Sequence, residues 1–423
     1  MPMAGPVVFG CGTRKARFRE GRGEVTRTRN SSIWRWKSAR VHATDAGDGQ
    51  VFVVASLWSP EDVADAAGAV YAQIADVLSN TGVESVHERL FGSLSVEAAV
   101  MAARDKALTA RGISPSSPVT YIQGRPPWGE GLAGVVIQAV SSSRPDDGPW
   151  TIMDGPVPRG RRWRRNGATF LALQNLHGVA QGCERVNTRP LQAQRMIERA
   201  EHLLREQGAT YRDVIRTWFY LSDILDWYAE FNQVRSAKYG EFGIMPVPAN
   251  DSPSLPASTG IQGNTPQNPA ATLDLLAVAG ATEYRPAIRQ LTNPHQEDPV
   301  SYGSAFSRGV LIGEPDVSLI QVSGTAAVGE GGRILCPEDV LAQVDCALDH
   351  IESLVGREGA RLEDICAATV FVKHPKDAAT YREVAASRGL DELPAVCVVG
   401  DICRDDLLFE IDAEVAFHPR SRR

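Results

Sequence analysis

The sequence predicts an α+β protein built from three similar units in tandem. One order of elements occurs three times along the chain: an amphipathic helix, a turn at glycine, a strand, a second helix and two further strands. The chain has 423 residues, of which 43% are hydrophobic. This length is sufficient for two or three domains with sizeable cores.

The expected boundaries between the units lie where proline, arginine and polar residues become frequent. They give an N-terminal extension at residues 1–48, a first unit at 49–142, a linker at 143–167, a second unit at 168–283, a linker at 284–300 and a third unit at 301–417.

The first unit begins with an apolar strand at residues 50–55. A helix start follows at residues 59–62, where proline occupies the first turn and an acid stands three residues after the cap. An apolar stripe of helical spacing runs from Val63 to Val77, and Gly82 ends the helix. The remaining expected elements are a strand at 86–91, a helix at 95–111 and strands at 119–123 and 134–140.

The second and third units repeat this order. Pro190 and Pro337 open their first helices, and Gly208 and Gly359 end them. The later elements are expected at 213–221, 224–239, 256–263 and 271–278 in the second unit, and at 364–372, 377–387, 393–399 and 402–416 in the third.

The last strand carries a polar face. From residue 408 onward Glu410, Asp412 and Glu414 alternate with apolar residues, which is typical of a strand with one buried side. We interpret Asp412 and Glu414 as a solvated face. Glu410 differs, because aligning the units places it on Asp274 in the second unit and on Val136 in the first. Three similar units with one position filled differently indicate one or two working interfaces.

Composition excludes several classes of protein. The net charge of −7 gives no reason to expect nucleic acid as a partner. We interpret the basic run at 159–165 as a solvated linker, with an anion or RNA patch as the alternative. No segment has the ~20 apolar residues of a membrane span. The N-terminus lacks a signal-peptide core, and seven scattered cysteines form no metal motif, so we expect a cytoplasmic protein without a metal site.

Two short motifs give the chain a family resemblance. Val322-Ser-Gly-Thr325, before a helix, and Glu410-Ile-Asp-Ala413, near the end, resemble the Rid/YjgF superfamily. Members of that superfamily are homotrimers of chorismate-mutase-like α+β units with ligand sites in the clefts between subunits. The resemblance therefore implies that the three units of this chain form a covalent pseudo-trimer.

A narrower resemblance is to the chorismatases, pseudo-trimeric relatives that hydrolyse chorismate. It rests on residues 216–232, 255–261, 302–308 and 403–411 and covers about residues 165–417. Simple Rid deaminases carry a substrate-holding arginine where this chain has Ser258 and Val396, which weakens an imine-deaminase interpretation. The segment 124–134 of the first unit matches neither group.

The chemistry that the resemblance implies is cleavage of an enol ether, which needs a carboxylic acid that stays protonated near neutral pH. A carboxyl group in a dry cleft has a raised pKa, and Glu410 is the candidate. Asp274 is either a possible second acid or a satisfied core aspartate. Arginines hold carboxylates with paired hydrogen bonds. The substrate-binding candidates are Arg382, Arg404, Arg216 and Arg308, with Tyr220, Ser258, Thr259 and Tyr302 as further contacts.

The leading hypothesis is a chorismatase-like hydrolase or lyase that takes a small carboxylate substrate, releases pyruvate and uses no cofactor. It would act as a monomeric pseudo-trimer or a weak homo-oligomer. One alternative is a Rid-like imine or enamine hydrolase, or another acid-catalysed enzyme of specialised metabolism. The other is a small-molecule binding protein without catalysis.

Overall fold

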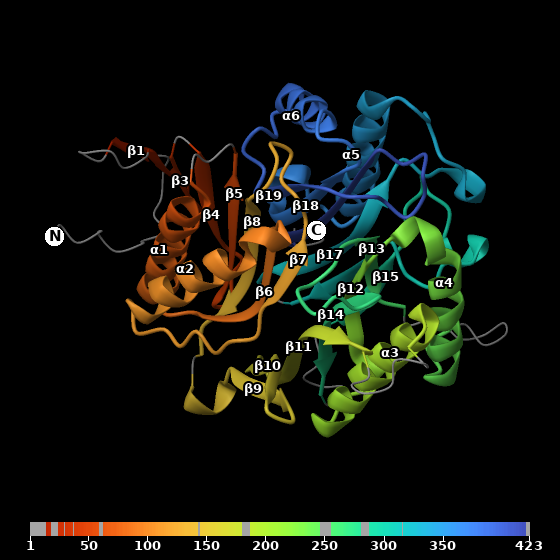
Figure 1. Cartoon of the computed structure of the whole chain (residues 1–423), viewed down its shortest axis with the longest axis horizontal. Helices are drawn as coiled ribbons and strands as arrows, with labels where there is room; N and C mark the ends of the chain where they lie inside the picture. The colour runs from red at the N-terminus through yellow and green to blue at the C-terminus, as the bar shows by residue number, and fades with distance from the viewer. Residues whose placement is uncertain are drawn as a thin grey trace.

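The computed structural model describes residues 14–17, 24–28, 30–36, 38–58, 62–142, 144–179, 187–245, 255–280, 287–314 and 316–419. Over these residues it contains three mixed β-sheets, each packed with two α-helices (Figure 1). The predicted α+β class with three repeated units is confirmed. None of the described helices combines the length and hydropathy needed to cross a membrane.

The first sheet has eight strands in the order β1-β2-β3-β4-β5-β8-β6-β7. Its elements are β1 (Arg14–Arg17), β2 (Glu24–Arg27), β3 (Ser31–Arg35), β4 (Ala39–Asp45), β5 (Gln50–Leu57), α1 (Val63–Thr81), β6 (Glu84–Gly92), α2 (Glu97–Thr109), β7 (Thr120–Gln123) and β8 (Leu132–Val140). The expected extension at 1–48 therefore contributes four strands to the first unit. The expected helix start at 59–61 lies outside the described residues, and Asp62 caps α1.

The second sheet has six strands in the order β13-β12-β14-β11-β10-β9. Its elements are β9 (Trp150–Asp154), β10 (Val157–Arg165), β11 (Ala168–His177), α3 (Arg189–Glu206), β12 (Val214–Leu221), α4 (Ile224–Glu241), β13 (Ala257–Gln262) and β14 (Ala271–Ala279). The expected linker at 143–167 contains β9 and β10. Its basic run is largely covered, because Arg161 pairs with Glu84 at 2.6 Å and Arg165 pairs with Glu314, while Arg164 stays exposed.

The third sheet has the order β15-β16-β17-β20-β18-β19. Its elements are β15 (Ala287–Leu291), β16 (Gly309–Gly313), β17 (Ser318–Ala326), α5 (Val340–Gly356), β18 (Ile365–Val372), α6 (Asp377–Ser387), β19 (Ala395–Val399) and β20 (Phe409–Phe417). The expected linker at 284–300 contains β15, and its residues 284–286 lie outside the described part. Short 3-10 turns occur at η1 (Leu94–Val96), η2 (Pro145–Asp147), η4 (Tyr211–Asp213), η5 (Pro299–Tyr302), η6 (Glu330–Gly332) and η7 (Leu362–Asp364).

The three units close around a pseudo-threefold axis. In each unit the short edge strand, β7, β13 or β19, pairs in parallel with its neighbour, and its last residue donates a backbone hydrogen bond to the next unit. Three such bonds form a closed ring: Gln123 N to Asn264 O at 2.7 Å, Gln262 N to Asp401 O at 3.0 Å, and Val399 N to Arg125 O at 2.8 Å. The ring shows that one chain reproduces the arrangement of a trimer.

Each unit has an apolar core between its helices and the outer face of its sheet. A further cluster occupies the space between the three inner sheet faces and includes Phe52, Trp218 and Val396, one from each unit. The inner faces therefore meet one another rather than water.

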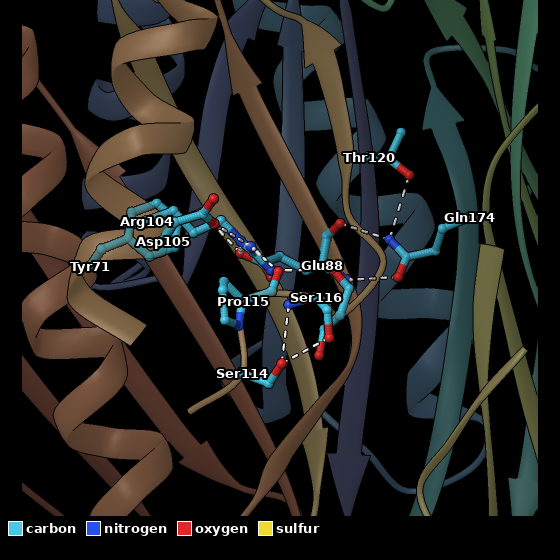
Figure 2. A network of polar contacts seen from close by, with 10 residues as sticks. Tyr71, Glu88, Arg104, Asp105, Ser114, Pro115, Ser116, Thr120 and Gln174 are labelled. Carbon is cyan, nitrogen blue, oxygen red and sulfur yellow. Dashed lines mark hydrogen bonds and ion pairs between the residues drawn. The ribbon is translucent and has the colours of Figure 1, made fainter. Parts of the chain in front are cut away.

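Figure 2 shows a buried polar network that joins the first unit to the second. Arg104 of α2 donates to both carboxylate oxygens of Glu88 on β6, at 2.9 and 2.7 Å, and Tyr71 of α1 donates to the same carboxylate at 2.9 Å. Gln174 of β11 donates to the backbone oxygen of Glu88 at 2.7 Å. Every charge in this network has a partner, so it serves the structure.

Candidate active site between the second and third units

The ladders of the three sheets give the equivalent positions of β8, β14 and β20. Asp274 pairs with Trp218 of β12, and Asp412 pairs with Thr369 of β18. The two pairs occupy the same place along their ladders, so the two aspartates are equivalent. Val136 is the matching residue of the first unit. The expected alignment of Glu410 with Asp274 is therefore wrong by two residues.

By the same ladders, Glu410 corresponds to Thr272 in the second unit and to Gly134 in the first. The displacement keeps all of these residues on the inner face, because side chains alternate with a period of two. Among these three equivalent positions, an acid stands only in the third unit.

Asp274 lies in the interface between the first and second units and is fully satisfied there. Its carboxylate accepts hydrogen bonds from His87 Nε2 at 3.1 Å, from Thr120 Oγ1 at 2.7 Å and from the backbone N of Asn175 at 2.8 Å. The side chain is completely buried. Of the two roles expected for Asp274, the structure supports the satisfied core aspartate.

Asp412 has the equivalent role between the second and third units. Its Oδ2 accepts from Arg216 Nη2 at 3.0 Å, Trp218 Nε1 at 3.1 Å and Thr259 Oγ1 at 2.8 Å. Farther along the strand, Glu414 pairs with Arg89 of the first unit at 3.0 Å. The expectation that Asp412 and Glu414 form a solvated face is wrong, because the neighbouring units cover this face and supply the cations.

A cleft between the second and third units has Glu410 at its wall. Its lining comes from α4, β13, the segment before β16, β17, the segment before β20, and β20 itself: Tyr228, Arg235, Ser258, Gly260, Tyr302, Ser304, Phe306, Arg308, Gly324, Ala326, Val328, Cys403, Arg404, Leu407 and Glu410. Both walls of the cleft come from this one chain.

The carboxyl group of Glu410 is buried without a charged partner. It is 4% exposed and forms no hydrogen bond or ion pair with any described residue. Burial, followed by the negative charge of Asp412, raises its pKa to about 8 against the opposing effect of Arg216. The protonated form of Glu410 therefore predominates at neutral pH.

Three arginines of the cleft have no carboxylate partner among the described residues. Arg235, 1% exposed, donates to Asn232 Oδ1 at 2.7 Å. Arg308 donates to the backbone oxygen of Glu297 and to the hydroxyl of Tyr302, each at 2.8 Å. Arg404 donates to the backbone oxygen of Gly332. Their positive charges surround a neutral acid, an arrangement that suits an anionic ligand.

The structure brings five of the sequence-predicted site residues together: Glu410, Arg308, Arg404, Ser258 and Tyr302. The others lie elsewhere. Arg382 is exposed on α6, and Tyr220 is buried against Phe91. Arg216 and Thr259 lie behind the cleft, bound to Asp412.

Arg235 is the lining cation that the sequence interpretation missed. It lies three residues after Asn232 and seven after Tyr228, so helical geometry places the three on one face of α4. This spacing is the signal that could have indicated Arg235, because residues 228 and 232 lie in the segment 216–232 that carries the narrower family resemblance.

The interface between the third and first units is closed at the equivalent place. Val396 of β19 packs over Gly134, where an added Cβ would lie 2.7 Å from its Cγ2. Val136 replaces the aspartate found in the other two interfaces. At this place the interface between the third and first units is apolar, whereas the cleft beside Glu410 is polar.

Comparisons with known proteins agree with this architecture. Residues 303–417 match the Endoribonuclease L-PSP family. A chorismatase of Streptomyces hygroscopicus is 32% identical over 229 residues, covering 49% of this chain and 62% of the relative. A chorismatase of Streptomyces rapamycinicus is 29% identical over 227 residues, covering 49% and 65%. The chain thus matches less than two thirds of the length of either relative.

A solved chorismatase structure superposes with a TM-score of 0.56 at 22% identity and covers 78% of this chain and 92% of that one. At 22% identity this match supports a shared fold only. The third unit therefore matches the Endoribonuclease L-PSP family, and 78% of the chain shares the fold of a solved chorismatase.

Proposed function

We propose that this chain is a chorismatase-like enzyme that cleaves the enolpyruvyl ether of chorismate or a related acid and releases pyruvate. The observation that carries the proposal is Glu410, a buried carboxylic acid with a pKa near 8 in a cleft lined by arginines without carboxylate partners. The names of the two curated relatives support the same reaction class.

In the proposed reaction Glu410 donates its proton to the terminal vinyl carbon of the enol ether. That carbon becomes a methyl group, and the neighbouring carbon becomes an oxocarbenium centre. A water molecule adds there, and the Glu410 carboxylate takes the proton that the water loses. The resulting hemiketal collapses to pyruvate and the ring alcohol. These steps balance without a redox or group-carrying cofactor.

The arginines would hold the substrate carboxylates and leave the enol ether facing Glu410. Arg235 belongs to the second unit, and Arg308 and Arg404 belong to the third, so the cleft can hold two separate anionic groups. Charge-assisted hydrogen bonds of this kind are roughly twice as strong as neutral ones. A small dicarboxylate is therefore the substrate class that the cleft fits best.

The test is incubation of the purified chain with chorismate, with pyruvate followed by coupled lactate dehydrogenase. We expect pyruvate in proportion to enzyme concentration, and chromatography of the ring product separates hydrolysis from aromatising elimination. A well-folded chain that releases no pyruvate would contradict chorismate as the substrate.

A further inference from the structure

We propose that Gly324 is a positioning residue for Glu410, because the space left by its missing side chain is where the acid lies. A Cβ added at Gly324 would stand 2.1 Å from Oε1 of Glu410 and 2.9 Å from its Cδ. Both distances are far below a van der Waals contact. The carboxyl group and a side chain at residue 324 therefore cannot occupy this place together.

The backbone does not itself require glycine at this position. The φ angle of Gly324 lies outside the left-handed region, so an L-residue can adopt its conformation. The residue lies in a bulge of β17, where the ladder with β20 shifts between Val322 and Thr325. The next-nearest atom to an added Cβ is Thr259 Cγ2, at 3.3 Å. The requirement for glycine comes mainly from the acid.

The second unit uses the same bulge differently. The ladder of β11 with β14 shifts between Leu173 and Leu176, which makes Asn175 the equivalent of Gly324. Asn175 has a φ of +51°, unlike Gly324, so the backbones of the two bulges differ, and Thr272 stands in the position of Glu410. In the second unit the residue at the bulge carries a side chain, and no acid stands at the position of Glu410.

The expected consequence rests on the proposed role of Glu410 as proton donor. A methyl group at residue 324 would move the carboxyl group towards the open cleft and away from the substrate carbon. Misplacement of a catalytic group by about 1 Å costs on the order of a hundredfold in rate. The arginines are untouched, so we expect kcat to fall about a hundredfold while KM changes less than threefold.

The test is a double-mutant cycle of kcat with Gly324→Ala, Glu410→Ala and the double variant. We expect Gly324→Ala to lower kcat in the wild-type background and to add no loss when Glu410→Ala has removed the carboxyl group. Gly400→Ala is the matched control, because its added Cβ would meet nothing closer than 3.6 Å. Full activity of Gly324→Ala, or a loss that simply adds to that of Glu410→Ala, would overturn the proposal.

A second readout needs no substrate and separates this proposal from the proposed function. The urea midpoint of the wild type should fall as pH rises from 5 to 9, because the buried Glu410 must then ionise. Gly324→Ala should flatten that fall by exposing the carboxyl group. Flattening in a chain that cleaves no chorismate would leave the positioning role standing, whereas an unchanged slope would overturn it.

The cycle also covers failure to fold. If Gly324→Ala does not fold alone but folds together with Glu410→Ala, the clash with the carboxyl group is demonstrated. If neither folds, glycine is needed for the strand itself, and the proposal is overturned.

Discussion

The Oδ2 atom of Asp412 lies 3.0 Å from Nη2 of Arg216, and each of these side chains is 1% exposed. Two residues earlier on the same strand face, Glu410 contacts no cation among the residues that the structure describes. The Asp412 charge is compensated by a donor from the neighbouring unit, whereas Glu410 avoids a charge by keeping its proton. One strand thus holds a structural carboxylate beside an acid suited to catalysis.

Asp412→Asn should destabilise the fold by about 3–5 kcal/mol, because it leaves the buried guanidinium of Arg216 without its counter-charge. Urea unfolding at pH 7 measures the loss. The control is Asp76→Asn, which breaks the pair of Asp76 with the half-exposed Arg111 and should cost less than about 1 kcal/mol. Equal losses in the two variants would contradict a structural role for Asp412.

The rate of pyruvate release should fall as pH rises through about 8. The reactive form of Glu410 is the protonated one, and its pKa is raised to about 8. We therefore expect kcat/KM to be level at lower pH and to fall tenfold per unit above the pKa. The measurement is the coupled assay from pH 6 to pH 10. A rate that instead increases through pH 8 would mean that Glu410 acts as a base.

Glu410→Gln should stabilise the fold at neutral and alkaline pH. The folded-state pKa of Glu410 lies above its usual value of 4.5, so the folded chain binds this proton more tightly than the unfolded chain. The stability contribution is complete below 4.5 and is lost as pH rises to about 8, by about 1.4 kcal/mol per unit. Unfolding from pH 4 to pH 9 should show this slope in the wild type and not in the variant; parallel curves would refute it.

Arg235→Gln and Arg308→Gln should each raise KM for chorismate about 10- to 100-fold, because each removes a charge-assisted hydrogen bond to a substrate carboxylate. The control is Arg382→Gln on the exposed surface of α6, which should leave KM unchanged. Steady-state kinetics of the three variants provide the comparison. If Arg382→Gln raised KM and Arg235→Gln did not, the assignment of the cleft would be wrong.

The repeat and the last strand could be predicted from the sequence, because alternation and helix ends are local signals. The residues that cover a strand face are not determined by the local sequence. The polar face of β20 was expected to meet water, yet Arg216 and Arg89 cover it from positions about 200 and 325 residues away in sequence, a separation that no periodicity reveals. The two-residue alignment error arose in the same way, because only the ladders show that Asp412 is the equivalent of Asp274.

The prediction of a linker in place of strand β10 failed for a comparable reason. Arg161 and Arg165 made β10 look like a solvated linker, since their partners Glu84 and Glu314 belong to the other two units. Arg382 was expected in the site, although α6 presents it to solvent, and Arg235 was not among the candidates. A sequence identifies candidate cations, but packing determines which of them keep an unpaired charge in a cleft.

The most direct measurement of the central claim is the rate of pyruvate release from saturating chorismate by the wild type and by Glu410→Gln, with circular dichroism to confirm folding. The amide preserves shape and binding but cannot donate the proton. We predict a loss on the order of a thousandfold with KM nearly unchanged. A variant that keeps more than a tenth of the wild-type rate would contradict Glu410 as the proton donor.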